Sequence, residues 1–97
     1  MFVGVSRIEL RIPANHSLKG KRHVLKGITG GVRAKFNAAI SEVDHHDQWQ
    51  RSTLGVALVS DTAFHAEKML REIERFIGRD DRIEILDAPT DVQPWED

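Results

Sequence analysis

The sequence predicts an α+β protein with the ferredoxin-like order βαββαβ, a sandwich in which two helices cover one face of a four-stranded antiparallel sheet. Three observations predict it. Several segments alternate apolar and polar residues, as half-buried strands do. Two others carry apolar residues at helical spacing between those strands. Only residues 45–51 separate the second predicted strand from the third, which is typical of a hairpin.

The first strand and the first helix are the clearest elements. Ile8, Leu10 and Ile12 alternate with charged residues in the strand from Phe2 to Ile12, and Pro13 ends it. Ser17 is a preferred N-cap residue for the helix that follows. The apolar stripe of that helix consists of Leu18, Leu25, Ile28, Val32 and Phe36.

The second half of the chain completes the pattern. In chain order, its predicted elements are a strand at Ala38–Asp44, a strand at Ser52–Ser60, a helix from Asp61 or Thr62 to about Ile77, and a strand at Arg82–Asp87 that can resume after Pro89. Gly78 ends the second helix. Residues 1–92 then form one domain, and residues 93–97 are expected to be a loose tail.

The composition excludes several classes of protein. The chain has 97 residues and no Cys, which rules out thiolate metal sites, iron–sulfur clusters, thiol nucleophiles and disulfide bonds. Its N-terminal segment is apolar only in short bursts, broken by Arg7, Glu9 and Arg11, so neither a signal peptide nor a membrane span is expected. A cytoplasmic protein is expected.

The charge is distributed unevenly along the chain. The formal net charge is −1, but residues 1–37 carry +7 and residues 38–97 carry −8. This polarity permits a basic surface on an otherwise acidic protein. Alternatively, the two halves neutralise each other across the fold.

The hairpin segment Glu42–Arg51 has an unusual composition for a turn. It contains two His, two Asp, a Trp and an Arg, but no Gly or Pro. Binding and catalytic groups are often carried by loops on a rigid scaffold. This segment is therefore the first candidate for a functional site.

The same segment resembles the YlxP-like bacterial proteins of unknown function, whose members read E-V-D-H-x-D-x-W-Q-R before a T-L-G-V-A-like strand. The residues that match are Glu42, Val43, Asp44, His45, Asp47, Trp49, Gln50, Arg51 and Thr53–Ala57. The family pattern S-L-K-x-K-R is matched by Ser17, Leu18, Lys19, Lys21 and Arg22. The resemblance covers nearly the whole chain and implies a ferredoxin-like fold. Genes of YlxP-like proteins often lie beside those of translation-initiation and ribosome-maturation factors, which implies a role in ribosome maturation or translation.

The predicted topology brings two motif-rich segments together. The first and third strands should be neighbours at the centre of the sheet, with the loop after the first strand and the hairpin loop at the same end. The residues expected to approach the hairpin loop are Asn15, His16, Ser17, Lys19, Lys21 and Arg22.

The start of the first helix is a candidate anion site. A helix N-terminus disfavours cations, so a basic first turn behind a Ser cap suits a bound phosphate. The predicted anion- and RNA-binding residues are Ser17, Lys19, Lys21, Arg22, Lys26 and Arg51. Charge reversal of Lys21 and Arg22 should then weaken RNA binding and leave the fold intact. The alternative is a solvated basic face paired with nearby acids.

The hairpin loop is the second candidate site, formed by Asp44, His45, Asp47, Trp49 and Gln50. A hydrogen-bonded Asp–His or Asp–Arg network is favoured over a metal, because Asp44 and His46 would point to one side of an extended strand and His45 and Asp47 to the other. Replacing Asp44, His45 or Arg51 with Ala should cost roughly 1–3 kcal/mol of stability. Trp49 either folds back as a lid on the sheet end or stands exposed as an anchor for a base or a partner protein.

No catalytic constellation is recognisable. The acylphosphatases share this topology but need a Gly-rich phosphate loop with an Arg, whereas the loop here is Pro13–Ser17. The sequence shows no Ser, His and Asp set arranged for nucleophilic catalysis. The third strand also lacks the aromatic residues on which RNA-recognition-motif domains stack bases. We therefore expect a binding module without catalysis, metal or cofactor.

The expected partner is RNA or a ribonucleoprotein, with no membrane involved. The alternative is a homodimeric protein-interaction or small-ligand regulatory module that uses the open sheet face, and a homodimer is expected in either case. A basic surface with salt-dependent binding favours the first, and an apolar sheet face favours the second.

Overall fold

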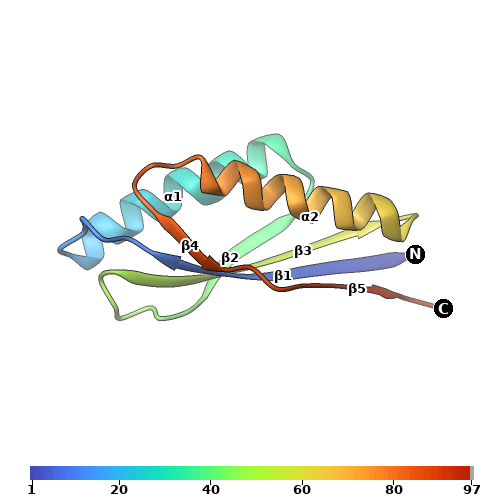
Figure 1. The fold of residues 1–97 in the computed structure, drawn as a ribbon, viewed down its shortest axis with the longest axis horizontal. Coiled ribbons are helices and arrows are strands. Elements are labelled where there is room, and N and C mark those ends of the chain that lie inside the picture. Colours follow the sequence, from blue (N-terminus) through green and yellow to red (C-terminus); the bar gives the residue numbers. More distant parts are fainter. Residues whose placement is uncertain (97) are drawn as a thin grey trace.

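A computed structural model describes residues 1–96 of the chain. Its elements are β1 (Phe2–Arg11), α1 (Leu18–Lys35), β2 (Ala39–Asp44), β3 (Arg51–Ser60), α2 (Ala63–Gly78), β4 (Glu84–Asp87) and β5 (Thr90–Pro94). Both helices lie on one side of a twisted antiparallel sheet and leave the other side uncovered (Figure 1). The predicted ferredoxin-like sandwich is confirmed, with five strands instead of four.

The strand order is β2-β3-β1-β4, and β5 also pairs with β1. β1 and β3 are antiparallel neighbours at the centre of the sheet, in register from Phe2↔Ser60 to Arg11↔Arg51. Their predicted adjacency is confirmed. β2 pairs with β3 on its outer side and is an edge strand.

The fifth strand arises because the last strand is broken in two. β4 pairs with the end of β1, and the ladder register shifts between Glu9 and Leu10. At the break, the Arg7 N–H donates to the Pro89 carbonyl at 3.1 Å. Because Pro has no N–H to give to a ladder, the strand is interrupted here and resumes at Thr90, opposite Ser6.

The predicted loose tail is wrong for Gln93, Pro94 and Trp95. Gln93 and Pro94 pair with the start of β1 in strand β5. The Trp95 N–H then donates to the Met1 carbonyl at 2.7 Å. The last residue of the predicted tail, residue 97, lies outside the described residues.

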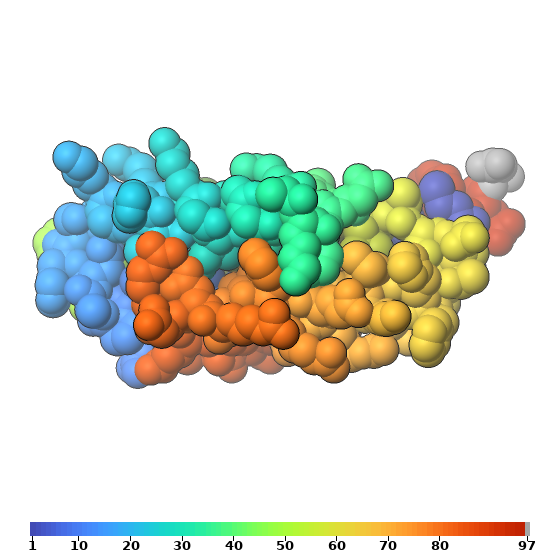
Figure 2. Space-filling model, turned by 90° about the horizontal axis from the view of Figure 1, so that it is seen from above, coloured from blue at the N-terminus to red at the C-terminus, as the bar shows by residue number. Residues whose placement is uncertain are grey.

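The core lies between the sheet and the two helices. Its fully buried side chains come from every layer: Ile8 and Leu10 on β1, Leu54 on β3, Val32 on α1 and Ile73 on α2. The helices lie side by side over this face (Figure 2). No helix within residues 1–96 combines the length and the apolar character that crossing a membrane requires.

Local capping sets where each helix begins. The Ser17 hydroxyl accepts the Gly20 N–H at 2.9 Å, which confirms the predicted N-cap of α1. The Thr62 hydroxyl accepts the His65 N–H at 3.1 Å and caps α2. Of the two cap residues predicted for this helix, Thr62 is therefore the one used.

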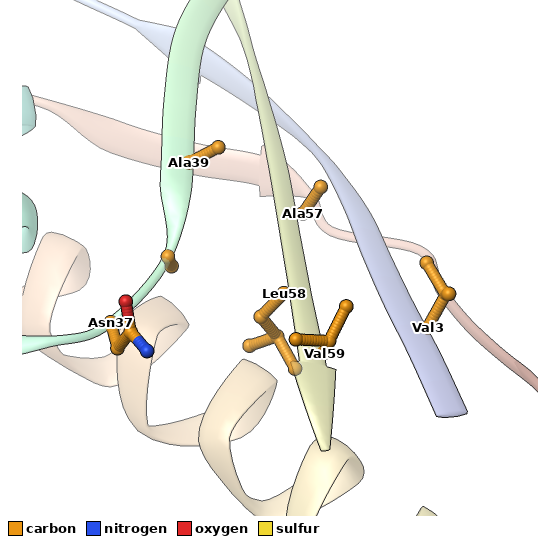
Figure 3. Close-up of a pocket in the computed structure, with 7 residues that line it drawn as sticks. Val3, Asn37, Ala39, Ala57, Leu58 and Val59 are labelled. Atoms are coloured by element: carbon orange, nitrogen blue, oxygen red, sulfur yellow. The ribbon is translucent and has the colours of Figure 1, made fainter. Parts of the chain in front are cut away.

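The uncovered sheet face has an apolar part and a charged part. Its exposed valines are Val59 (62% exposed), Val43 (48%) and Val5 (42%). Val3, Ala57 and Val59 lie beside one another on β1 and β3 (Figure 3). Further along β1, towards the hairpin loop, the same face carries charged side chains, so the sheet offers both kinds of surface.

Candidate functional site

Two loops meet at one end of the sheet, the segment after β1 and the β2–β3 hairpin loop (Figure 1). The Ile12 N–H donates to the Gln50 carbonyl at 2.9 Å. The Gln50 side-chain amide donates to the carbonyls of Pro13 (3.3 Å) and Asn15 (3.1 Å), and the Asn15 amide donates to the Trp49 carbonyl at 2.6 Å. The predicted convergence of the two segments is therefore present, and it is made largely through backbone carbonyls.

Lys21 is the centre of this junction. Its side chain is only 2% exposed, and its Nζ lies 3.0 Å from Oε2 of Glu42. The same Nζ donates to the carbonyls of His45 (2.7 Å), His46 (3.2 Å) and Arg51 (3.2 Å). The ammonium group thus binds carbonyl oxygens from both ends of the hairpin loop, in the way that a bound metal cation would. We call this arrangement the lysine cage.

The lysine cage places Lys21 inside the protein and not on the predicted anion-binding surface. A buried ammonium surrounded by four oxygen atoms does not face solvent, so Lys21 is not part of an exposed anion-binding surface. The signal that could have shown this is its spacing. Lys21 lies four residues before Leu25 and seven before Ile28, in line with the apolar stripe that packs on the sheet.

Glu42 complements Lys21 from the inner face of the edge strand. It lies two residues after the buried Ile40, so the strand alternation turns its side chain toward α1. The Ser52 hydroxyl donates to the same Glu42 oxygen at 2.7 Å. Charge pairing and hydrogen bonding together satisfy a carboxylate that is only 21% exposed.

The turn at His45 has an unusual backbone. Its φ of 62° is the only positive value at a non-glycine residue in the part of the chain that the structure describes. His is among the residues enriched in this region, although the conformation still costs roughly 1–2 kcal/mol. The Gln48 N–H donates to the His45 carbonyl at 3.1 Å, and Lys21 donates to the same oxygen. The lysine cage thus helps to hold the strained turn.

Asp44 supports this turn from the other side. Its Oδ1 accepts the His45 N–H at 2.7 Å, and its Oδ2 lies 3.1 Å from an Arg7 nitrogen. The His45 N–H, aided by the positive charge of Arg7, holds the pKa of Asp44 below its ordinary value. Because the folded-state pKa is depressed, the stability from Asp44 is present at neutral pH and is lost as the pH falls through that pKa.

A second network lies on the open sheet face, and Glu9 is its centre. Glu9 accepts the Thr53 hydroxyl at 2.7 Å and the Arg7 Nε at 3.1 Å. The His45 Nε2 and an Arg51 nitrogen each lie 3.7 Å from its Oε2. An Asp–His or Asp–Arg network was predicted for the hairpin, and Glu9 was not among its predicted members because this residue alternates onto the solvated face of β1.

The predicted anion-binding residues separate into four groups. Lys21 is buried, and the Arg51 side chain joins Glu9 on the open sheet face instead of α1. The Ser17 hydroxyl caps α1. Lys19 and Arg22 are exposed on α1 with Lys26.

These three cations form what we call the basic row, Lys19, Arg22 and Lys26. Their spacing of three and four residues places them on one helix face. Within residues 1–96, no ion pair involves any of them, and α1 itself contains no Asp or Glu. A groove between α1 and β2 continues the row, lined by Arg22, Leu25, Lys26, Thr29, Arg33, Ser41 and Glu42.

The structure decides between the two alternatives for Trp49. The residue is 53% exposed, so it does not close over the sheet end as a lid. Asp47 and Gln48 beside it are also exposed. Trp49 therefore stands on the surface of a loop whose backbone is fixed by Asn15, Gln50 and Lys21.

The hairpin loop contains adjacent His and Asp residues, which are ordinary metal ligands. In the described part of the chain, no three His, Asp or Glu side chains cluster closely enough to hold a metal ion. Two of the candidate ligands have other partners. Asp44 pairs with Arg7, and the His45 ring lies beside Glu9.

Comparison with known proteins places the chain in a family. The model of DUF503, described as a protein of unknown function, matches residues 3–90. The chain belongs to the DUF503 family. A relative, the uncharacterized protein YlxP of Bacillus subtilis (strain 168), is 42% identical over 83 residues, which cover 86% of this chain and 90% of the relative. The resemblance to YlxP-like proteins is confirmed, and the family description assigns no activity to DUF503.

Solved structures similar to this DUF503 chain support the fold alone. The de novo designed protein Foldit4 has a TM-score of 0.55 and 14% identity, covering 99% of this chain and 100% of that one. The de novo designed protein LFR1 1, with a ferredoxin fold, has a TM-score of 0.52 and 18% identity, covering 98% and 88%. Both agree with the ferredoxin-like arrangement of this DUF503 protein.

Proposed function

We propose that this DUF503 protein is a non-catalytic module that binds RNA through the basic row of α1. The observation that carries the proposal is that Lys19, Arg22 and Lys26 are exposed together on a helix without acidic residues. Phosphate groups are the natural partners of such a row, because neutralising them releases counterions. Lys21 and Arg51 have no part in this revised surface.

The biological setting is a further part of the proposal. The resemblance to YlxP-like proteins, whose genes often lie beside those of translation-initiation and ribosome-maturation factors, supports a role in ribosome maturation or translation. A cytoplasmic location and a partner that is RNA or a ribosomal particle follow from that role. Gene neighbourhood is an association, so binding has to be tested directly.

The test reverses the charge of the whole basic row in the triple variant Lys19→Glu, Arg22→Glu, Lys26→Glu. We expect the wild-type protein to bind RNA oligonucleotides with log affinity falling linearly as log salt rises. The triple variant should bind roughly 100-fold more weakly at low salt, with a slope flatter by about two units, because about three phosphate contacts are lost. Fluorescence anisotropy across a salt series measures both quantities.

The second helix offers a matched control. Lys68, Arg71 and Arg75 are exposed on α2 with the same spacing of three and four residues. Reversing all three changes the net charge by the same amount at a different place. An equal loss of affinity in both triple variants, or a wild-type protein without salt-dependent RNA affinity, would contradict the proposal.

A second candidate function is a homodimeric interaction module, and the exposed valines of the sheet face favour it. Val5, Val43 and Val59 would be buried if the uncovered faces of two copies packed together. We expect light scattering at high micromolar concentration to give the mass of a dimer, and the variant Val59→Asp to give that of a monomer. A monomeric mass for the wild-type protein would rule this candidate out.

A further inference from the structure

Trp49 is a large aromatic side chain that the fold leaves on the surface. A tryptophan residue that is 53% exposed forgoes much of the free energy that burial would provide. The loop that carries it is nevertheless held firmly. Lys21 donates to the carbonyls of His45 and His46 in the loop and to that of Arg51 at the start of β3, and Gln50 is tied to the segment after β1. A rigid loop presenting an exposed ring loses little conformational entropy when a partner binds.

Asn15 joins this loop directly to the start of α1. Its side-chain amide donates to the Ser17 carbonyl at 2.7 Å and to the Trp49 carbonyl at 2.6 Å. The backbone of Trp49 is therefore one side chain away from the N-cap, and Lys19 lies two residues after that cap. Gly20 makes room for this link, since a Cβ there would lie 2.3 Å from the Asn15 Oδ1.

We infer that Trp49 is a stacking platform for an unpaired base, so that the ligand class of the basic row is single-stranded RNA. The inference rests on the proposed function. The Asn15 link joins the backbone of Trp49 to the start of the helix that carries the basic row. Single-strand-binding proteins combine exposed aromatic rings, on which bases stack, with cations that follow the phosphates. The row extends over about 10 Å of helix, which suits a short stretch of backbone. A duplex hides the faces of its bases and cannot use the ring.

Because every base has a π-face, this platform confers preference for single strands without strong preference for sequence. Asp47, two residues before Trp49, is exposed and carries the opposite charge to the row. Its carboxylate opposes phosphate binding beside the ring. The variant Asp47→Asn should therefore bind single-stranded RNA more tightly than the wild-type protein, and the gain should shrink as salt rises.

The test compares Trp49→Ala with Trp95→Ala. Trp95 is also exposed (60%) but lies beside Met1, at the other end of β1 from the hairpin loop. We expect Trp49→Ala to weaken binding of a single-stranded RNA oligonucleotide about tenfold with an unchanged salt slope, and Trp95→Ala to bind as the wild type does. In the variant Trp95→Phe, Trp49 is the only tryptophan, and bound RNA should quench its fluorescence.

The outcomes separate this inference from the proposed function. If the basic-row variant loses affinity but Trp49→Ala binds as tightly as Trp95→Ala, the stacking inference is wrong and the proposed RNA binding stands. If Trp49→Ala lowers the affinity for an RNA duplex as much as for a single strand, the inference is also wrong. If Trp49→Ala does not fold, the test uses the RNA affinity of Trp49→Phe and the Trp49 fluorescence of Trp95→Phe. If bound RNA does not quench that fluorescence, the inference is wrong.

Discussion

Replacing Lys21 with Met should lower the free energy of unfolding by about 3 kcal/mol, because removing one member of a buried ion pair leaves its partner uncompensated. Met fills much of the same volume, so the loss reports the ammonium group and not a cavity. Without Nζ, the Ser52 hydroxyl is the one side-chain partner that Glu42 keeps among residues 1–96, and the carbonyls of His45, His46 and Arg51 lose a donor. Urea denaturation followed by circular dichroism measures the change.

Lys19→Met is the matched control, since Lys19 is an exposed lysine in the same turn of α1. Its effect on stability should stay within about 0.5 kcal/mol. Equal stability of the two variants would show that the lysine cage does not hold the hairpin loop. Charge reversal at Lys21 is now expected to destabilise the fold instead of leaving it intact, because it would place two carboxylates, at positions 21 and 42, together in a buried site.

Replacing Glu9 with Ala should lower the free energy of unfolding by about 2 kcal/mol, because a carboxylate that gathers several donors is removed. The Thr53 hydroxyl is fully buried and would lose its acceptor. The charges of Arg7 and Arg51 would lose their shared partner. Thermal and urea unfolding measure the loss.

Glu84→Ala provides the comparison for Glu9. Glu84 pairs with Arg11 at 3.0 Å, but both side chains are about half exposed, so the pair should contribute no more than about 1 kcal/mol. If Glu9→Ala lowers the free energy of unfolding no more than Glu84→Ala does, the network around Glu9 does not stabilise the fold as predicted. The losses of stability predicted for replacing Asp44, His45 or Arg51 with Ala stay predictions. Because the Asp44–Arg7 pair is exposed, we expect the loss for Asp44 to be small.

The parts of the fold that local chemistry encodes could be predicted from the sequence. Alternation along β1 and β3, the stripe of α1 and the Ser17 cap each follow from neighbouring residues. The expected resumption of the last strand after Pro89 is confirmed as strand β5. Its partner could not be predicted in the same way. Strand β5 is a short, mostly polar segment whose order comes from pairing with the distant start of β1, and nothing within Thr90–Pro94 shows that pairing.

The candidate site shows the same limit. Topology was enough to bring the two loops together, because it depends only on the order and direction of the strands. The predicted exposure of Lys21 was wrong because its partners are mainly backbone carbonyls. Every residue has a backbone carbonyl, so the sequence does not show which ones Lys21 will meet. Their convergence depends on the positive φ of His45, and that conformation has no clear signature in a loop without glycine.

The most direct test of the proposed interface is a titration of ¹⁵N-labelled protein with a single-stranded RNA oligonucleotide, followed by backbone and indole N–H chemical shifts. We predict that the perturbed signals cluster at residues 17–26 and 46–50 and include the Trp49 indole, while the Trp95 indole is unchanged. Two results would contradict binding through α1. One is a set of perturbed signals centred on the open sheet face, at Val5, Ala57 and Val59. The other is the absence of any perturbation at low salt.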